Sequence, residues 1–166
     1  MTRQAPRWSI RSATPEDAAA IALFHLGCWK DAYRGIVPED VLARMDVTER
    51  TTRWRRRLTE GRRCTALAES PRRIVGIASW GVSHDPPEAG MPALELASLY
   101  VARAQWGSGL ADALVEHAIS DQPAHLWVYA ANARARAFYA RHGFLPDGQE
   151  QLDVATGVLE CRYVRR

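Results

Sequence analysis

The sequence predicts an α/β fold with a mixed, mostly antiparallel sheet, and two observations lead to this prediction. The apolar runs 94–101 and 125–131 have the composition of strands, and a helical pattern separates them. Strands joined through a helix can run parallel, whereas tight hairpins make antiparallel pairs. Most other strand-like segments are close enough along the chain for hairpins. No linker is long enough to divide the chain, so we expect one domain over residues 1–166.

The composition is that of a globular protein rather than a disordered one, with 47% hydrophobic and 25% charged residues. No apolar run approaches the ~20 residues of a membrane helix, and the N-terminus lacks the apolar core of a signal peptide. Cys28, Cys64 and Cys161 are odd in number and lack metal-site spacing. We therefore expect a cytoplasmic protein with reduced thiols, no metal site and no membrane contact. The net charge of +3 suits a polyanionic cofactor without requiring one.

The first predicted elements are a strand at 8–11 and a helix after it. Thr14 is the expected N-cap of this helix, Pro15 its first residue, and Asp17 the partner of a capping box. The apolar residues then follow a helical period to about Trp29.

Two further helices are predicted before the first hairpin. Pro38 can open a short helix that ends near residue 45. Asp46 and Glu49 form a capping-box pattern for a longer helix, which Gly61 ends.

The remaining strands come from apolar runs between turn signals. Runs 64–69 and 74–80 predict a hairpin. The segment 84–92 holds three prolines and a glycine and must be a loop. The tail predicts strands at about 149–154 and 158–164.

Gly107 and Gly109 separate the strand 94–101 from a helix whose apolar residues recur every three or four positions. A helix start carries unpaired N–H groups and a partial positive charge, and glycines let the main chain approach a phosphate. This predicts a site for a phosphate-bearing ligand; the alternative is a turn whose glycines serve its geometry alone. The motif GxxxxGK[ST] is absent, and Asp112 stands where GxGxxG needs its third glycine.

A second segment strengthens the ligand interpretation. After the strand-like HLWVYAA comes NARARAFYARHGF, a helical pattern that begins at Asn132 and stops at Gly143. Together with LYVARAQWGSGLA, in this order and at this separation, it resembles the GCN5-related N-acetyltransferase (GNAT) superfamily. The resemblance implies a sheet of six or seven strands whose two parallel central strands splay apart. It also implies acetyl transfer from acetyl-CoA to a primary amine of a small molecule or peptide by direct attack in a ternary complex. Many members pair as homodimers.

The resemblance implies a set of cofactor contacts. Backbone N–H groups near Leu99–Val101 would polarise the acetyl carbonyl, the turn amides would hold the pyrophosphate, and Asn132 would bind the pantetheine arm besides capping its helix. Trp106 departs from the family pattern, which has Gln or Arg there, and Arg103 is a candidate replacement. The full set of expected cofactor residues is Leu99, Tyr100, Val101, Trp106, Gly107, Ser108, Gly109, Leu110, Ala111, Asn132, Ala135 and Phe138.

Two residues are the catalytic candidates. Tyr139 matches the tyrosine that protonates the CoA thiolate in the family; the alternative is an aromatic core residue. Glu95 lies in an otherwise apolar strand and is the candidate base, which the resemblance implies acts through water; the alternative is an edge-facing or salt-bridged glutamate. His84, His25 and Tyr33 are weaker candidates for the base.

The segment from Trp29 to Pro38 resembles the family pattern W-x-x-A-Y-x-G-I-x-P, so Trp29 and Tyr33 are expected to border the acceptor pocket. The basic run RWRRR at 53–57 is expected to be a solvated helix face with Trp54 and Leu58 turned inward. It is too short, and the net charge too mild, for us to expect nucleic-acid binding. The alternative to an enzyme is a non-catalytic acyl-CoA-binding or sensing module with the same fold.

Overall fold

Seven strands form a single sheet in the order β1-β2-β3-β4-β5-β7-β6. The computed structural model describes residues 8–71, 73–84 and 88–166. All neighbouring strands are antiparallel except β4 and β5, which are parallel. This confirms the predicted fold class. The strands are β1 Ser9–Ser12, β2 Cys64–Ser70, β3 Arg73–Val82, β4 Leu94–Val101, β5 Ala124–Tyr129, β6 Leu145–Leu152 and β7 Leu159–Arg165.

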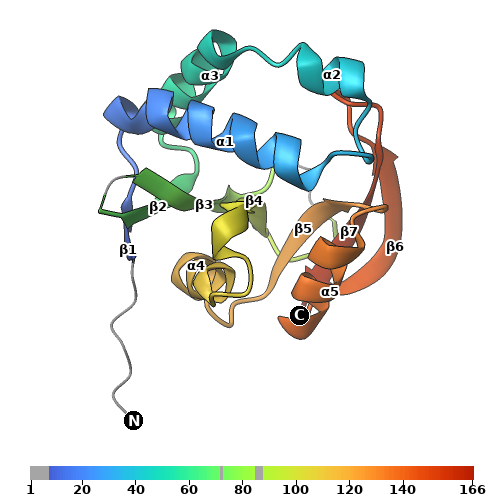
Figure 1. Cartoon of the computed structure of the whole chain (residues 1–166). Coiled ribbons are helices and arrows are strands. Elements are labelled where there is room, and N and C mark those ends of the chain that lie inside the picture. The colour runs from blue at the N-terminus through green and yellow to red at the C-terminus, as the bar shows by residue number, and fades with distance from the viewer. Residues whose placement is uncertain (1–7, 72, 85–87) are drawn as a thin grey trace.

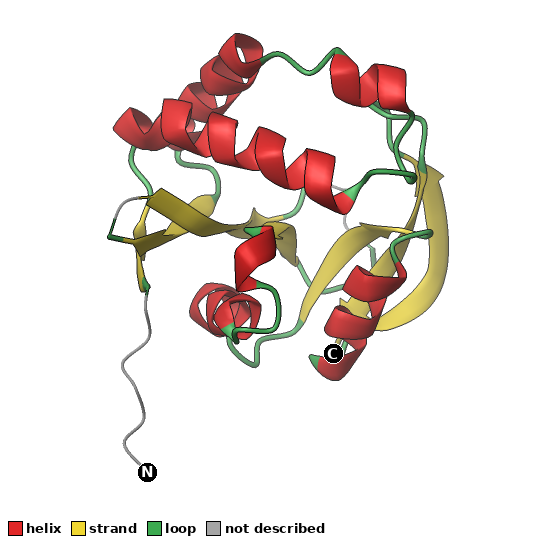
Figure 2. Cartoon of the chain, in the orientation of Figure 1, coloured by secondary structure: helices red, strands yellow, loops and turns green. Residues whose placement is uncertain are grey.

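Helices cover both faces of the sheet (Figure 1; Figure 2). On one face lie α1 (Ala18–Ala32), α2 (Glu39–Ala43) and α3 (Val47–Glu60), and on the other lie α4 (Leu110–Ile119) and α5 (Ala133–Arg141). Within the described part of the chain, no helix combines the length and apolarity needed to cross a membrane.

The helix ends follow the local sequence signals. The Asp46 carboxylate accepts a hydrogen bond from the Glu49 amide at 2.7 Å, and Gly61 ends α3 with φ +63°. At Thr14 the structure opens with a 3-10 turn, Pro15–Asp17, so that α1 begins three residues after the expected start. There the Asp17 carboxylate accepts from the Thr14 amide at 2.8 Å, which is one half of the predicted capping box.

The parallel strands β4 and β5 meet at one end only. Their ladder contains the single pair Glu95 and His125, and the strands separate beyond it. On its other side β4 pairs with β3, but with a bulge. Ser98 lies opposite Ser79 and Leu96 opposite Trp80, which leaves Ala97 without a partner on β3. The splayed central strands therefore agree with the expected architecture and open a space in the middle of the sheet.

Separate apolar clusters fill the two sides of the sheet. On one side, Leu96 and Leu126 pack with Leu114 of α4. On the other side, Leu67 and Ile77 pack with α1 and with Trp54 of α3, which is 3% exposed as the inward-facing residue predicted for the arginine run. The sheet thus separates a face covered by α4 from a face covered by α1 and α3.

The element bounds differ from the predictions mainly near the C-terminus. β5 ends at Tyr129, two residues before the predicted end, because Ala130 and Ala131 form the turn into α5. β6 begins at Leu145, four residues before the predicted start, although it contains Pro146 and Gly148. β6 is an edge strand whose pairing is irregular between Pro146 and Glu150, and an edge tolerates a residue without an N–H donor.

Candidate active site

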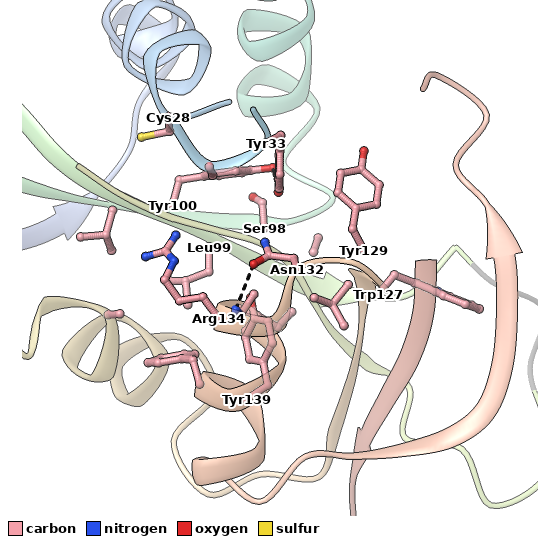
Figure 3. A pocket seen from close by; sticks show the side chains of 18 of the residues that line it. Cys28, Tyr33, Ser98, Leu99, Tyr100, Trp127, Tyr129, Asn132, Arg134 and Tyr139 are labelled. Atoms are coloured by element: carbon pink, nitrogen blue, oxygen red, sulfur yellow. Dashed lines mark hydrogen bonds between the residues drawn. The ribbon is translucent and has the colours of Figure 1, made fainter. Parts of the chain in front are cut away.

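A cleft of about 630 Å³ lies where β4 and β5 separate. Side chains of α1, β4, β5 and α5 meet around it (Figure 3), together with the turn before α4 and the strands β6 and β7. Most of the residues predicted from the sequence line it: Trp29, Tyr33, Glu95, Leu99, Tyr100, Val101, Trp106, Gly107, Gly109, Ala111, Asn132, Ala135, Phe138 and Tyr139. Ser108 and Leu110 do not, and the Leu110 side chain is fully buried in the core on the α4 side of the sheet.

The turn before α4 holds backbone N–H groups in two classes. In the first class, the N–H groups have acceptors. The Trp106 amide donates to the Arg103 carbonyl and the Ser108 amide to the Gln105 carbonyl, both in the preceding 3-10 turn Arg103–Gln105. The Leu110 amide donates to Ser108 Oγ at 3.3 Å. Among the described residues, no acceptor is found for the amides of Gly107, Gly109, Ala111 and Asp112. Of the turn amides expected to hold a pyrophosphate, these four are therefore available to bind it, and they lie at the positive end of a helix.

The two glycines of this turn have φ values that other residues rarely adopt, +76° at Gly107 and +84° at Gly109. A Cβ atom at either position would meet no atom within 4 Å. The glycines are therefore required by the backbone conformation, while the space beside them stays open for a ligand. An open turn with unused donors fits a phosphate group.

Trp106 is fixed across the turn. Its Nε1–H donates to the Val101 carbonyl at 3.1 Å, and the guanidinium carbon of Arg134 lies 3.5 Å from the centroid of its ring. Arg103, the replacement cation expected from the sequence, is farther from this ring, at 5.7 Å, and does not line the cleft. Arg134 lines the cleft and makes no hydrogen bond or ion pair within the described residues. The sequence analysis missed it.

The start of α5 places two predicted residues. Asn132 is 9% exposed, and its Oδ1 accepts from the Ala135 amide at 3.1 Å (Figure 3), as the N-cap interpretation predicts. Seven residues on, Tyr139 packs edge-on against Phe138 and Phe144. Burial raises the pKa of Tyr139 above its usual value, with the Arg134 charge acting weakly the other way. The phenol is therefore protonated at neutral pH and able to donate a proton.

Glu95 lines the cleft and is also ion-paired. Its Oε2 accepts from Arg63 Nη2 at 2.6 Å, and the two side chains are 13% and 15% exposed. The salt-bridged alternative drawn from the sequence is thus present. This ion pair does not exclude Glu95 as a base, because its carboxylate still lines the cleft; the role of base stays a prediction.

Aromatic side chains form the part of the cleft nearest α1. Tyr33 meets both Trp29 and Tyr129 edge-on, each at 4.9 Å between ring centroids, and its hydroxyl lies 3.2 Å from that of Tyr100. The Tyr129 hydroxyl donates to Asp153 at 2.9 Å. The lining here also includes Trp127, Gln151 and Glu160. The sequence analysis found Trp29 and Tyr33, and missed the residues of β5 and of the β6–β7 hairpin.

The two histidines weighed as bases are not in the cleft. His84 is exposed. His25 lies beneath Tyr100, where Nε2 accepts from Trp29 Nε1–H at 2.8 Å and Nδ1 faces Trp54 and Arg50. Burial, together with the charges of Arg50 and Arg57, lowers the pKa of His25 to about 3. His25 is therefore neutral and structural at physiological pH.

Among the described residues, no group of three or more His, Cys, Asp or Glu could hold a metal ion. Cys28 lines the cleft, and burial, helped by Asp31, raises the pKa of its thiol to about 12. This thiol is a poor nucleophile, since only the thiolate attacks readily.

Comparison with known proteins agrees with this geometry. A probable N-acetyltransferase of Mycobacterium tuberculosis is 27% identical over 148 residues, covering 84% of this chain and 81% of that protein. The PaiA N-acetyltransferase of Thermoplasma acidophilum, solved with coenzyme A, has a TM-score of 0.66 at 17% identity, covering 92% of this chain and 97% of that one. A putative acetyltransferase of Salmonella typhimurium, yncA, solved with acetyl-CoA, has a TM-score of 0.67 at 18% identity, covering 96% and 93%.

These structural similarities show a shared fold, and the family follows from the sequence. Residues 29–144 match the acetyltransferase (GNAT) family. This range includes the aromatic residues Trp29, Tyr33 and Tyr129 of the cleft (the aromatic wall), the splayed strands, the glycine turn and α5. The chain therefore belongs to this family and is an N-acetyltransferase.

Proposed function

We propose that this protein binds acetyl-CoA in the cleft between β4 and β5 and transfers the acetyl group directly to a primary amine of a small molecule or peptide. The observation that carries the proposal is the division of one cleft into two chemically different parts. The turn before α4 supplies amides that have no acceptor among the described residues, and α5 adds the Arg134 cation beside it, whereas the wall near α1 supplies aromatic rings and carboxylates. A donor and an acceptor can occupy these parts at the same time.

The donor part suits a pyrophosphate. The amides of Gly107, Gly109, Ala111 and Asp112 lack acceptors among the described residues, and Arg134 adds a positive charge beside them. Relatives of the same fold were solved with coenzyme A and with acetyl-CoA. Bound acetyl-CoA would supply the thioester, and the backbone N–H groups on the β4 edge that β5 leaves uncovered would face its carbonyl oxygen.

The acceptor part suits an amine. Trp29, Tyr33 and Tyr129 present aromatic rings, which attract cationic nitrogen, and Asp153 lies beside them. Lys and Arg are absent from the lining contributed by α1, β5, β6 and β7, as far as these elements are described. An amine approaching as an ammonium ion meets favourable charges there, and a carboxylate would not.

Direct transfer needs proton movements at the amine nitrogen and at the sulfur. An amine that arrives as an ammonium ion first loses one proton to water; its nitrogen then bonds to the acetyl carbon and loses a second proton, for which Glu95 is the candidate acceptor through water. The carbon–sulfur bond breaks, and the Tyr139 phenol, kept protonated by its raised pKa, is the candidate donor to the sulfur. The raised pKa of Cys28 argues against an acyl-cysteine route.

Titration calorimetry with acetyl-CoA, CoA and a longer acyl-CoA, followed by a free-thiol assay with a panel of amines, tests the proposal. We expect saturable binding that prefers the acetyl form, and thiol release that depends on the amine. Binding without turnover on any amine would favour the alternative, a non-catalytic acyl-CoA-binding module. Absence of binding would refute the donor site.

A further inference from the structure

The Ser98 hydroxyl is buried and has no hydrogen-bond partner within the described part of the chain. Ser98 lies at the centre of β4, next to the bulge at Ala97, and lines the cleft (Figure 3). A buried hydroxyl without a partner is destabilising, because folding removes its hydrogen bonds to water and returns none. A ligand bound in the cleft would supply the missing hydrogen bond.

The neighbouring strand provides an internal comparison. Ser79 of β3 lies directly opposite Ser98, so their side chains are on the same face of the sheet. The Ser79 hydroxyl is fully buried and shares a 2.8 Å hydrogen bond with the Thr65 hydroxyl. Of two serines in the same register, the one away from the cleft therefore has a hydrogen-bond partner, and the one in the cleft has none among the described residues.

The bulge decides which face Ser98 occupies. Leu96, Leu99 and Val101 of β4 pack on the α4 side, with the core beneath the phosphate turn. Ser98 and Tyr100 are on the opposite side, because Ser79 shares its face with Ile77, which packs against α1. The Ser98 hydroxyl thus faces the side of Trp29 and Tyr33, where the acceptor part of the cleft lies.

Other polar side chains on this face of β4 are already engaged. The Glu95 carboxylate accepts from Arg63, and the Tyr100 hydroxyl is paired with that of Tyr33. Ser98 is left with a hydroxyl oxygen that can accept one N–H at the point where the central strands separate.

We propose that Ser98 is an acceptor-binding residue whose Oγ accepts a hydrogen bond from the attacking amine and so directs its lone pair toward the acetyl carbon. This role rests on the proposed amine acetylation. It predicts that Ser98 contributes to turnover of the amine and not to binding of acetyl-CoA, whose expected anchors are the α4 turn and Asn132.

The test compares Ser98→Ala with the control Ser79→Ala. Each purified variant is assayed with acetyl-CoA and the best substrate of the parent protein from 1,4-diaminobutane, phenethylamine, leucinamide and a short peptide with a free N-terminus. For Ser98→Ala we expect kcat/KM for the amine to fall at least tenfold, the Kd of acetyl-CoA to stay within twofold, and Tm to be unchanged or higher. For Ser79→Ala we expect a lower Tm and an unchanged kcat/KM. Ser98→Thr, which retains the hydroxyl, should recover most of the turnover.

The possible failures are distinguishable. If Ser98→Ala turns over the amine normally, or lowers Tm as much as Ser79→Ala does, the role of Ser98 is refuted while the proposed function stands. If the parent protein binds acetyl-CoA but acetylates none of the four amines, the proposed function fails and the assignment of Ser98 fails with it.

Discussion

The Arg134 guanidinium carbon lies 3.5 Å from the centroid of the Trp106 ring, so a cation from α5 reaches across to the turn that precedes α4. The family pattern places Gln or Arg at the position of Trp106. In this protein the aromatic ring holds a positive charge that the turn itself does not provide, because stacking on tryptophan restricts the guanidinium. We propose that the two residues together replace one basic side chain.

We predict that Arg134→Gln weakens acetyl-CoA binding about tenfold, or ~1.4 kcal/mol, which is a typical magnitude for a charged hydrogen bond. The Kd of Arg134→Lys should lie between those of the parent protein and Arg134→Gln, since lysine retains the charge but cannot stack as a planar guanidinium does. Calorimetric titration at two salt concentrations measures the effect. Arg103→Gln is the matched control and should change Kd less than twofold. A larger effect at Arg103 would assign the phosphate contact to that residue instead.

The fold could be predicted from the sequence because the hydrophobic periodicity of each segment agreed with the turn and capping residues at its ends. Asp46 caps the start of α3 and Gly61 ends it, as their sequence signals indicate, whereas the Glu49 carboxylate pairs with Arg53. For the edge strand β6 the sequence predicts a start four residues too late, because Pro146 and Gly148 normally interrupt a strand. Pairing with β7 outweighs that local signal, and the sequence of β6 alone does not indicate this pairing.

The site was predicted only in part, and the bulge in β4 is one reason. Regular alternation would place Glu95 and Ser98 on opposite faces, whereas the extra residue Ala97 places both toward α1. A bulge has no clear sequence signature, so Ser98 could not be found. In β5 the alternation of Trp127 and Tyr129 with buried aliphatic residues was available as a signal, and it would have identified the aromatic wall.

Tyr139→Phe should lower kcat about 100-fold and leave the Kd of acetyl-CoA unchanged, since general acid catalysis contributes at least this much. The raised pKa of Tyr139 means that the phenol stays protonated well into the alkaline range, so its ionisation should not limit the rate near neutral pH. Steady-state kinetics from pH 6 to 9 measures both effects. Tyr163→Phe, a buried tyrosine outside the cleft lining, is the control. An unchanged kcat in Tyr139→Phe would leave Tyr139 as a packing residue.

His25 should make the protein sensitive to acid. Its pKa is about 3 in the folded state, against about 6.5 when unfolded, so the unfolded chain binds the proton as pH falls below 6.5. Stability attributable to this group is full above pH 6.5 and is lost progressively toward pH 3. Between pH 7 and pH 5 the loss is about 2 kcal/mol. The free energy of unfolding in urea, measured for the parent and for His25→Leu at both pH values, gives the contribution of His25. The variant should lose less stability on acidification. Equal losses in both proteins would show that His25 is not the acid-sensitive group.

The ion pair between Glu95 and Arg63 allows a structural and a catalytic role for Glu95 to be separated. Glu95→Gln leaves Arg63 charged and nearly buried, with an Nε that has no partner in the part of the chain that the structure describes, and should destabilise the fold by about 3 kcal/mol. It should also depress activity, most strongly at low pH, where the amine is least deprotonated. Arg63→Gln alone should lower stability and retain turnover.

The double variant Glu95→Gln/Arg63→Gln decides between the two roles, because it removes both charges together. We expect it to recover much of the stability lost in Glu95→Gln, since no uncompensated charge remains. If Glu95 is the base, turnover of the folded double variant stays low and its pH–rate profile stays shifted. Recovery of turnover together with stability would show that the carboxylate serves only to hold Arg63, and the proton would then pass from the amine to solvent.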